Sequence, residues 1–92
     1  MEPRQFTATQ GRYLALICLY IKLNRRSPAE ADMQHYFGVT APAVHGMVMT
    51  LERQGLITRQ PGRARSIALN VSPADLPLLE FLLAPSTDDR AN

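Results

Sequence analysis

The chain has almost no cysteine and no tryptophan, and Cys18 is its single thiol. One thiol cannot form an internal disulfide, so an apolar core has to hold the fold, and a reducing compartment is the natural setting. Cys18 lies in an apolar stretch, where a lone cysteine is usually a small core residue. The sequence therefore predicts a cytoplasmic protein without a disulfide framework.

Long apolar runs are missing as well. The longest, residues 13–21, is far shorter than the roughly 18 to 20 apolar residues of a membrane span, and no export signal precedes it. Metal-ligand clusters, glycine-rich phosphate loops and catalytic-triad spacings are not found. We therefore expect no membrane partner, no metal, no cofactor and no enzyme activity. The length of 92 residues suits one core, expected as a domain over 1–83 with a flexible tail over 84–92.

The net charge is only +2, but its distribution is uneven. Residues 1–26 carry +4 and residues 52–69 carry +3, whereas residues 27–51 carry −2 and residues 70–92 carry −3. Nine of the ten basic residues are arginine, whose guanidinium group matches phosphate oxygens in a two-pronged geometry. The charge pattern therefore indicates an anionic partner, with solubility of an exposed loop as the competing explanation.

A long first helix is predicted over residues 8–24. Thr7 can cap its N-terminus, and Gln10 can reach back to complete a capping box. Apolar residues occupy two faces of this helix, so the second face must pack on the C-terminal segment or on another subunit. We expect a homodimer, while a monomer in which the two apolar stripes bury each other stays open. The expected dimer interface comprises Leu16, Leu19, Tyr20, Leu23, Leu79, Leu82 and Leu83.

Caps, a terminating glycine and a Pro-Gly turn divide the rest of the chain into further elements. We expect two more helices, a β-hairpin with a loop of about six residues, and a short C-terminal helix. Ser27 and Pro28 supply the cap and the first position of the second helix. The expected bounds are 28–37 and 40–54 for the helices, 56–59 and 66–71 for the strands, and 76–83 for the C-terminal helix.

This order of elements is typical of a winged helix-turn-helix, a mainly α fold with a small β-hairpin. It consists of a three-helix core, a two-stranded wing and here a short C-terminal helix. In that fold the third helix enters the major groove of duplex DNA, and the hairpin lies along the neighbouring backbone or minor groove. We therefore expect the helix over 40–54 in the major groove and the hairpin over 56–71 as the wing.

The start of the third helix has small side chains that allow a close approach to base edges. Gly46 costs the helix about 1 kcal/mol relative to alanine, which favours a functional reason for it. Small residues at a helix start are also ordinary helix-forming choices, and His45 can be a plain surface histidine. The expected DNA contacts are Arg25, Arg26, Ser27, Thr40, Ala41, Pro42, Ala43, His45, Gly46, Arg59, Arg63, Arg65 and Ser66.

Over residues 6–69 the chain resembles the DNA-binding domain of LexA-type repressors. The motifs are Phe-Thr-Ala-Thr-Gln at 6–10, a proline-led helix ending in Phe-Gly at 28–38, Ala-Pro-Ala-Val at 41–44, Leu-x-x-x-Gly-Leu-Ile at 51–57 and Gly-x-x-Arg-x-Ile-x-Leu at 62–69. The resemblance implies a bacterial transcriptional regulator, associated with the nucleoid. The outward side chains of the third helix differ from the family's, so its operator is not implied. After residue 70 nothing resembles the family's serine-lysine protease domain, so we expect no self-cleavage.

Two functions of different classes fit these observations. The first is sequence-specific binding of double-stranded DNA, where a twofold dimer would read a palindromic site. The second is a protein-interaction module that uses the apolar face of the first helix and the C-terminal segment, since a fold does not fix a function. Binding to a duplex that weakens with added salt would favour the first.

Overall fold

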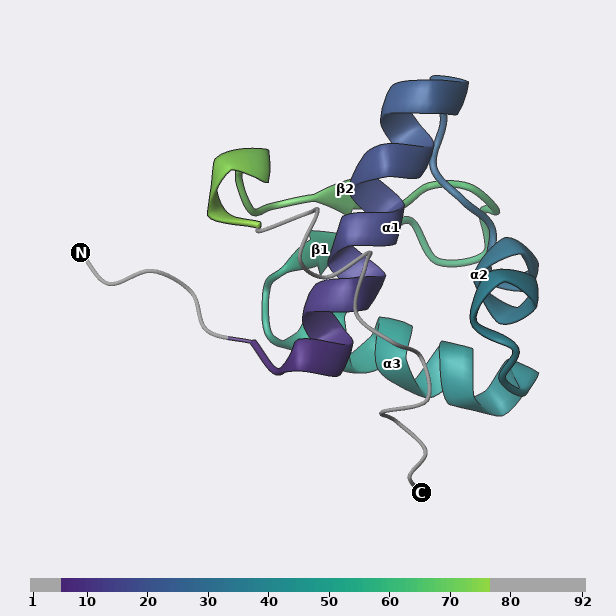
Figure 1. Cartoon of the computed structure of the whole chain (residues 1–92). Coiled ribbons are helices and arrows are strands. Elements are labelled where there is room, and N and C mark those ends of the chain that lie inside the picture. The colour runs from purple at the N-terminus through teal and green to yellow at the C-terminus, as the bar shows by residue number, and fades with distance from the viewer. Residues whose placement is uncertain (1–5, 77–92) are drawn as a thin grey trace.

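The computed structural model describes residues 6–76 of the chain (Figure 1). Its elements are α1 (Ala8–Asn24), α2 (Glu30–Phe37), α3 (Ala41–Arg53), β1 (Ile57–Thr58), β2 (Ala68–Leu69) and the 3-10 turn η1 (Pro73–Asp75). Three helices followed by an antiparallel hairpin confirm the winged helix-turn-helix prediction. Apart from Leu76, the expected C-terminal helix lies outside the described residues, and so do the expected tail and the domain boundary at 83.

The first helix forms as its capping signals predict. The Thr7 hydroxyl accepts the Gln10 N–H at 3.1 Å, and Gln10 Oε1 accepts the Thr7 N–H at 3.0 Å. This reciprocal capping box satisfies N–H groups that a helix start otherwise leaves without partners. At the other end, Arg25 takes a left-handed conformation with φ 61° and closes the helix through its N–H to Ile21. The predicted range of 8–24 is confirmed.

One apolar cluster holds the helices and the hairpin together. α1 crosses the middle of the molecule and packs against α3 and the strands (Figure 1). Each fully buried aliphatic side chain in such a cluster contributes about 1.5 to 3 kcal/mol to the free energy of unfolding. Cys18 is 3% exposed, as expected for a small core residue. The cluster consists of Tyr13, Leu14, Ile17, Cys18, Met33, Val44, Val48, Leu51, Leu56, Ile57, Ile67, Val71 and Leu76.

α2 begins two residues later than the predicted start at Pro28. Its N-cap is Ala29, whose N–H is accepted by the Asp32 carboxylate at 2.9 Å. Ser27 does not cap the helix, because it is 5% exposed and its hydroxyl accepts the Ile67 N–H at 3.2 Å. A residue of the α1–α2 loop therefore joins the hairpin to the helices instead of starting α2.

The turn between α2 and α3 follows the prediction. Gly38 ends α2 with φ 67°, a conformation that glycine adopts without steric cost. Two residues later Thr40 caps α3, and its hydroxyl accepts the Ala43 N–H at 3.2 Å. This short turn fixes the angle between α2 and α3. The N-terminal end of α3 lies at the surface of the molecule.

The hairpin loop is longer than predicted, because β1 and β2 pair over two residues each and residues 59–67 connect them. Side chains take the place of the missing ladder. The Ile67 N–H is bound by the Ser27 hydroxyl, and the Gln60 N–H donates to the Ser66 hydroxyl at 2.9 Å. The strand register places Ile57 opposite Leu69 and Thr58 opposite Ala68.

Candidate nucleic-acid interface

The leading turn of α3 is exposed to solvent, from Thr40 through Ala43. Gly46 lies one turn further on, and a Cβ built there would meet nothing within 4 Å. No packing contact among the described residues therefore requires glycine at this position. Because glycine weakens a helix by about 1 kcal/mol relative to alanine, its presence needs a reason outside the fold.

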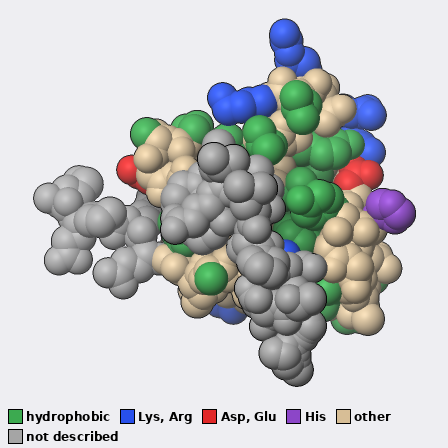
Figure 2. Space-filling model, in the orientation of Figure 1, with side chains coloured by type: hydrophobic (Ala, Val, Ile, Leu, Met, Phe, Trp, Pro, Cys, Tyr) green, Lys and Arg blue, Asp and Glu red, His purple; other side chains and the backbone are tan. Residues whose placement is uncertain are grey.

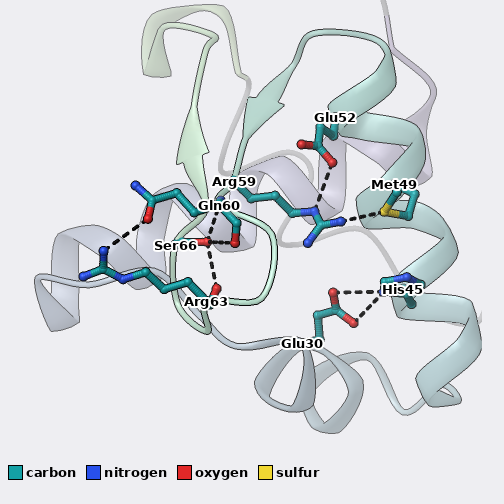
Figure 3. Close-up of polar contacts among 8 residues, drawn as sticks. All are labelled: Glu30, His45, Met49, Glu52, Arg59, Gln60, Arg63 and Ser66. Atoms are coloured by element: carbon teal, nitrogen blue, oxygen red, sulfur yellow. Dashed lines mark hydrogen bonds and ion pairs between the residues drawn. The ribbon is translucent and has the colours of Figure 1, made fainter.

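His45 lies beside Gly46 and is held by α2. Its Nδ1 is 3.2 Å from both carboxylate oxygens of Glu30, the first residue of α2 (Figure 3). The side chains of His45 and Glu30 remain 57% and 39% exposed. The imidazole therefore sits on the open surface with one nitrogen already bound.

The tip of the hairpin loop carries Arg63, which is exposed and donates from Nη1 to Gln60 Oε1 at 3.1 Å. Arg59 lies instead along α3 (Figure 3). It donates from Nε to Glu52 Oε1 at 3.0 Å and from Nη2 to Met49 Sδ at 2.9 Å. Among the described residues, Arg63 is the loop arginine that pairs with no carboxylate, so it is best placed to meet a phosphate.

The base of the loop carries Arg65, which is bound on three sides. Its Nη1 lies 3.0 Å from Asp32 Oδ2, 3.2 Å from the Tyr20 hydroxyl and 3.3 Å from the Ser27 carbonyl oxygen. Its backbone is left-handed, with φ 56°. Arg65 was expected among the DNA contacts, but its guanidinium fastens the loop to α1 and α2.

Asp32 takes part in two interactions at once. The Ala29 N–H and the nearby Arg65 guanidinium hold the pKa of its carboxyl below the usual value. A carboxylate that accepts a backbone N–H and faces a cation stays ionised to lower pH. The contact between α2 and the hairpin loop therefore persists in mildly acidic solution.

The hydroxyl groups of Ser27 and Ser66 form hydrogen bonds within the protein. Ser27 is buried, so its side chain is not available to a ligand, which corrects its expected role as a DNA contact. The Ser66 hydroxyl lies 2.9 Å from the carbonyl oxygen of Arg63 and 3.2 Å from that of Gln60. Both hydroxyls shape the loop that presents Arg63.

Arg25 and Arg26 are exposed beside the C-terminal end of α1. Figure 2 shows Lys and Arg side chains gathered around that end of the helix, at the top of the view. The N-terminus of α2 nearby does not add a free positive helix end to these two arginines. Glu30 and Asp32 occupy the first turn of α2, and carboxylates there already neutralise the positive end of the helix dipole.

Sequence reasoning missed three acidic side chains, each of which pairs with an expected contact residue. Their partners are in other elements, so no local motif marks them. For Glu30 and Asp32 the one signal in the sequence is the net negative charge of residues 27–51 next to arginine-rich neighbours, and Glu52 lies outside that segment. The pairs are Glu30 with His45, Glu52 with Arg59, and Asp32 with Arg65.

The residues expected at a dimer interface fall into three groups. Leu16, Leu19 and Tyr20 are half-buried, and Leu16 packs against the core cluster. Leu23 is 77% exposed at the end of α1. The three C-terminal leucines, at 79, 82 and 83, lie outside the described residues.

Within residues 6–76, no three histidine, cysteine or acidic side chains come together in a way that could hold a metal ion. In the same part of the chain, no helix combines the length and the apolar character needed to cross a bilayer.

The three-helix core, the exposed start of α3 and the hairpin beside it define a winged helix-turn-helix domain. Residues 3–66 match the family model described as the LexA DNA binding domain. The chain belongs to this family.

Proteins named LexA repressor are among its relatives. That of Thermosipho africanus is 37% identical over 70 residues, which cover 76% of this chain and 35% of the repressor. The Thermosipho melanesiensis protein is 38% identical over 66 residues, covering 72% and 33%, and the Oleidesulfovibrio alaskensis protein is 30% identical over 67 residues, covering 73% and 32%. The chain spans about a third of the length of these relatives.

Proposed function

We propose that this protein is a sequence-specific double-stranded DNA-binding protein that regulates transcription in a bacterium, as its relatives named LexA repressor suggest. In this proposal α3 enters the major groove and the hairpin loop contacts the neighbouring backbone. The protein acts in the cytoplasm, on the nucleoid, and it works by binding, without catalysis, a metal or a cofactor.

The observation that carries the proposal is the leading half of α3, where small exposed residues precede Gly46 and no packing contact requires that glycine. Short side chains allow the backbone of a helix to approach base edges closely. Arg63 on one side and Arg25 and Arg26 beside α1 supply cations for the backbone, which provides most of the non-specific affinity. The contact set proposed here is Arg25, Arg26, Thr40, Ala41, Pro42, Ala43, His45, Gly46, Arg59 and Arg63.

The test replaces Gly46 with alanine. Gly46→Ala should raise the free energy of unfolding by about 1 kcal/mol because alanine favours the helix, yet weaken binding to a selected duplex. Fluorescence anisotropy gives the affinity, and urea unfolding gives the stability. Thr9→Ala, at an exposed position of α1, is the matched control that favours a helix without changing the proposed surface.

Two outcomes contradict the proposal. A wild-type protein that binds no duplex, or binds with an affinity independent of salt, excludes DNA as the partner and favours the protein-interaction module. A Gly46→Ala variant that is more stable and binds DNA as tightly as the wild type places the contact surface elsewhere.

We further propose a homodimer through the second apolar face of α1 and the C-terminal leucines at 79, 82 and 83. Leu23 supports it, because a leucine that is 77% exposed gains from being covered. Leu23→Asp gives a cleaner test than a change at Leu16, which also packs against the core. Sedimentation should show a wild-type dimer and a monomeric Leu23→Asp variant that keeps the helical circular dichroism spectrum and has a melting temperature independent of protein concentration, and a wild-type monomer would contradict the dimer.

A further inference from the structure

The pair formed by Glu30 and His45 is not explained by the stability of the fold. Both side chains are exposed, and an exposed ion pair contributes little to stability. A carboxylate on a surface proposed to bind phosphates also repels the ligand. Glu30 lowers the affinity for DNA in general, and apart from its place at the positive end of the α2 dipole, its side-chain contact is with His45.

Glu30 determines which nitrogen of His45 meets a ligand. A carboxylate only accepts hydrogen bonds, so Nδ1 has to carry the hydrogen that it shares with Glu30. In the part of the chain that the structure describes, Nε2 makes no hydrogen bond, and more than half of the side chain is exposed. Figure 3 shows the two side chains facing each other across the gap between α2 and α3. The bond from Nδ1 thus orients the ring, and Nε2 is the nitrogen available to a ligand.

The chemistry of that atom depends on the charge of the ring. With Nδ1 protonated, a neutral imidazole presents Nε2 as an acceptor, whereas an imidazolium presents it as a donor. In the major groove the donors are the amino groups of cytosine and adenine, and guanine presents two acceptors side by side. We propose that Glu30 is a positioning residue that makes His45 read an amino group when neutral and guanine when charged. This inference rests on the proposed function.

Other charged groups near Glu30 and His45 pair with other residues or lie elsewhere on the helices. Arg59, Arg63 and Arg65 line a pocket of about 220 Å³ together with Glu30, and two of these arginines are bound to carboxylates of their own. On α2, Asp32 faces Arg65. The charged residues of α3 itself, Glu52 and Arg53, lie at its C-terminal end. Glu30 is therefore the charged group in contact with His45.

The experiment selects binding sites from a random duplex library at pH 5.5 and pH 8.5, on either side of the range in which histidines change charge. For the wild type, one position of the selected site should change from cytosine or adenine at pH 8.5 to guanine at pH 5.5. The preference should be about fivefold, the lower end of the discrimination that one base contact provides. The lowered pKa of the Asp32 carboxyl keeps the loop attachment ionised at both pH values.

Variants at the pair separate positioning from folding. In Glu30→Gln the amide can donate or accept, so the neutral ring is no longer held in one tautomer and the preference for cytosine or adenine at pH 8.5 should disappear, whereas the imidazolium at pH 5.5 still presents an Nε2–H. Its overall affinity should rise, because a negative charge has left the surface. Glu30→Asp keeps the charge but has a shorter side chain, so it should lose the base preference without the gain in affinity. His45→Gln should lose the change, and His35→Gln, at the chain's other histidine, should keep it.

The outcomes distinguish this inference from the proposed function. Identical base preferences of the wild type at both pH values, or a preference for cytosine or adenine at pH 8.5 that survives in Glu30→Gln, overturn the role of Glu30 and leave DNA binding intact. A wild-type protein that selects no sequence at either pH overturns both. Thermal unfolding at pH 5.5 and 8.5 verifies that each variant is folded during selection.

Discussion

The base and the tip of the hairpin loop each carry an arginine, but the two arginines have different surroundings. At the base, Arg65 is bound to Asp32, Tyr20 and the Ser27 carbonyl group. At the tip, two residues earlier, Arg63 is exposed and its guanidinium donates to Gln60 of the same loop. A count of positive charges treats these arginines alike, whereas in the structure Arg65 is bound to other elements and Arg63 is exposed.

The difference arises from the backbone and from partners in other elements. Arg65 has a left-handed backbone, with φ 56°, and its guanidinium meets the carboxylate of Asp32 on α2. The Ile67 N–H then binds the buried Ser27 hydroxyl, so the base of the loop is attached at two points. A fixed base presents the tip in a defined position, which would reduce the entropy lost in the proposed contact of Arg63 with a phosphate.

The largest effect is expected at the buried attachment of the base. Ser27→Ala leaves the Ile67 N–H without a partner in the interior, which should cost about 1 to 3 kcal/mol of unfolding free energy. A loss of that size lowers the melting temperature of a domain this small by roughly 4 to 8 °C per kcal/mol. Thr9→Ala, which removes an exposed hydroxyl from α1, should leave the melting temperature unchanged or slightly raised. Equal melting temperatures for wild type and Ser27→Ala would show that the attachment is dispensable.

Ser27 also shows why part of the fold could not be predicted. The Ser-Pro-x-Glu sequence is a good local signal for a helix start, yet the serine is buried and bonds to a residue 40 positions away. Local signals were sufficient for α1 and for the cap of α3, because their hydrogen bonds join residues three apart. They failed where a distant backbone N–H competed for the same hydroxyl.

The same limit applies to the candidate site. The exposed start of α3 could be predicted, because the apolar positions of one helix determine which face points outward. The pairs of Glu30 with His45 and of Arg65 with Asp32 could not, because each joins two elements whose relative position depends on the whole core. The sequence therefore predicted which face of α3 is exposed, but not which charged side chains form ion pairs.

The next largest effect is expected at the tip and should appear in binding. Arg63→Ala should reduce the slope of log K against log salt by about 0.9, the value for one phosphate contact, and weaken binding about fivefold at 0.15 M salt. Its melting temperature should stay at the wild-type value. The charge-balanced variant Arg63→Ala with Asp75→Asn restores the net charge at a distant exposed position. If this double variant recovers the wild-type slope, overall charge and not a contact of Arg63 explains the effect.

A smaller effect on DNA affinity is expected at Asp32, and its direction distinguishes loop attachment from net charge. Asp32→Asn keeps an oxygen for the Ala29 N–H but removes the charge that holds Arg65. If attraction between net charges governed binding, loss of a carboxylate would tighten it. Because the loop loses its attachment, we expect binding about two- to fivefold weaker, the range for one exposed ion pair. Asp75→Asn makes the same chemical change away from the loop, so anisotropy titrations of both variants should differ, and tighter binding by Asp32→Asn would contradict the attachment.

The smallest expected effect concerns pH. The Ala29 N–H, and after it the Arg65 guanidinium, lower the pKa of the Asp32 carboxyl in the folded protein, whereas an unfolded chain has an aspartate pKa of about 3.9. The ionised carboxylate therefore stabilises the fold above the unfolded pKa, and this contribution disappears as pH falls through the lower folded value. Urea unfolding between pH 2.5 and 6 should show wild type more stable than Asp32→Asn by less than about 1 kcal/mol at pH 6, with the two converging at the acidic end. For Arg63→Ala the difference from wild type should stay near zero at every pH, because the tip takes no part in holding the fold.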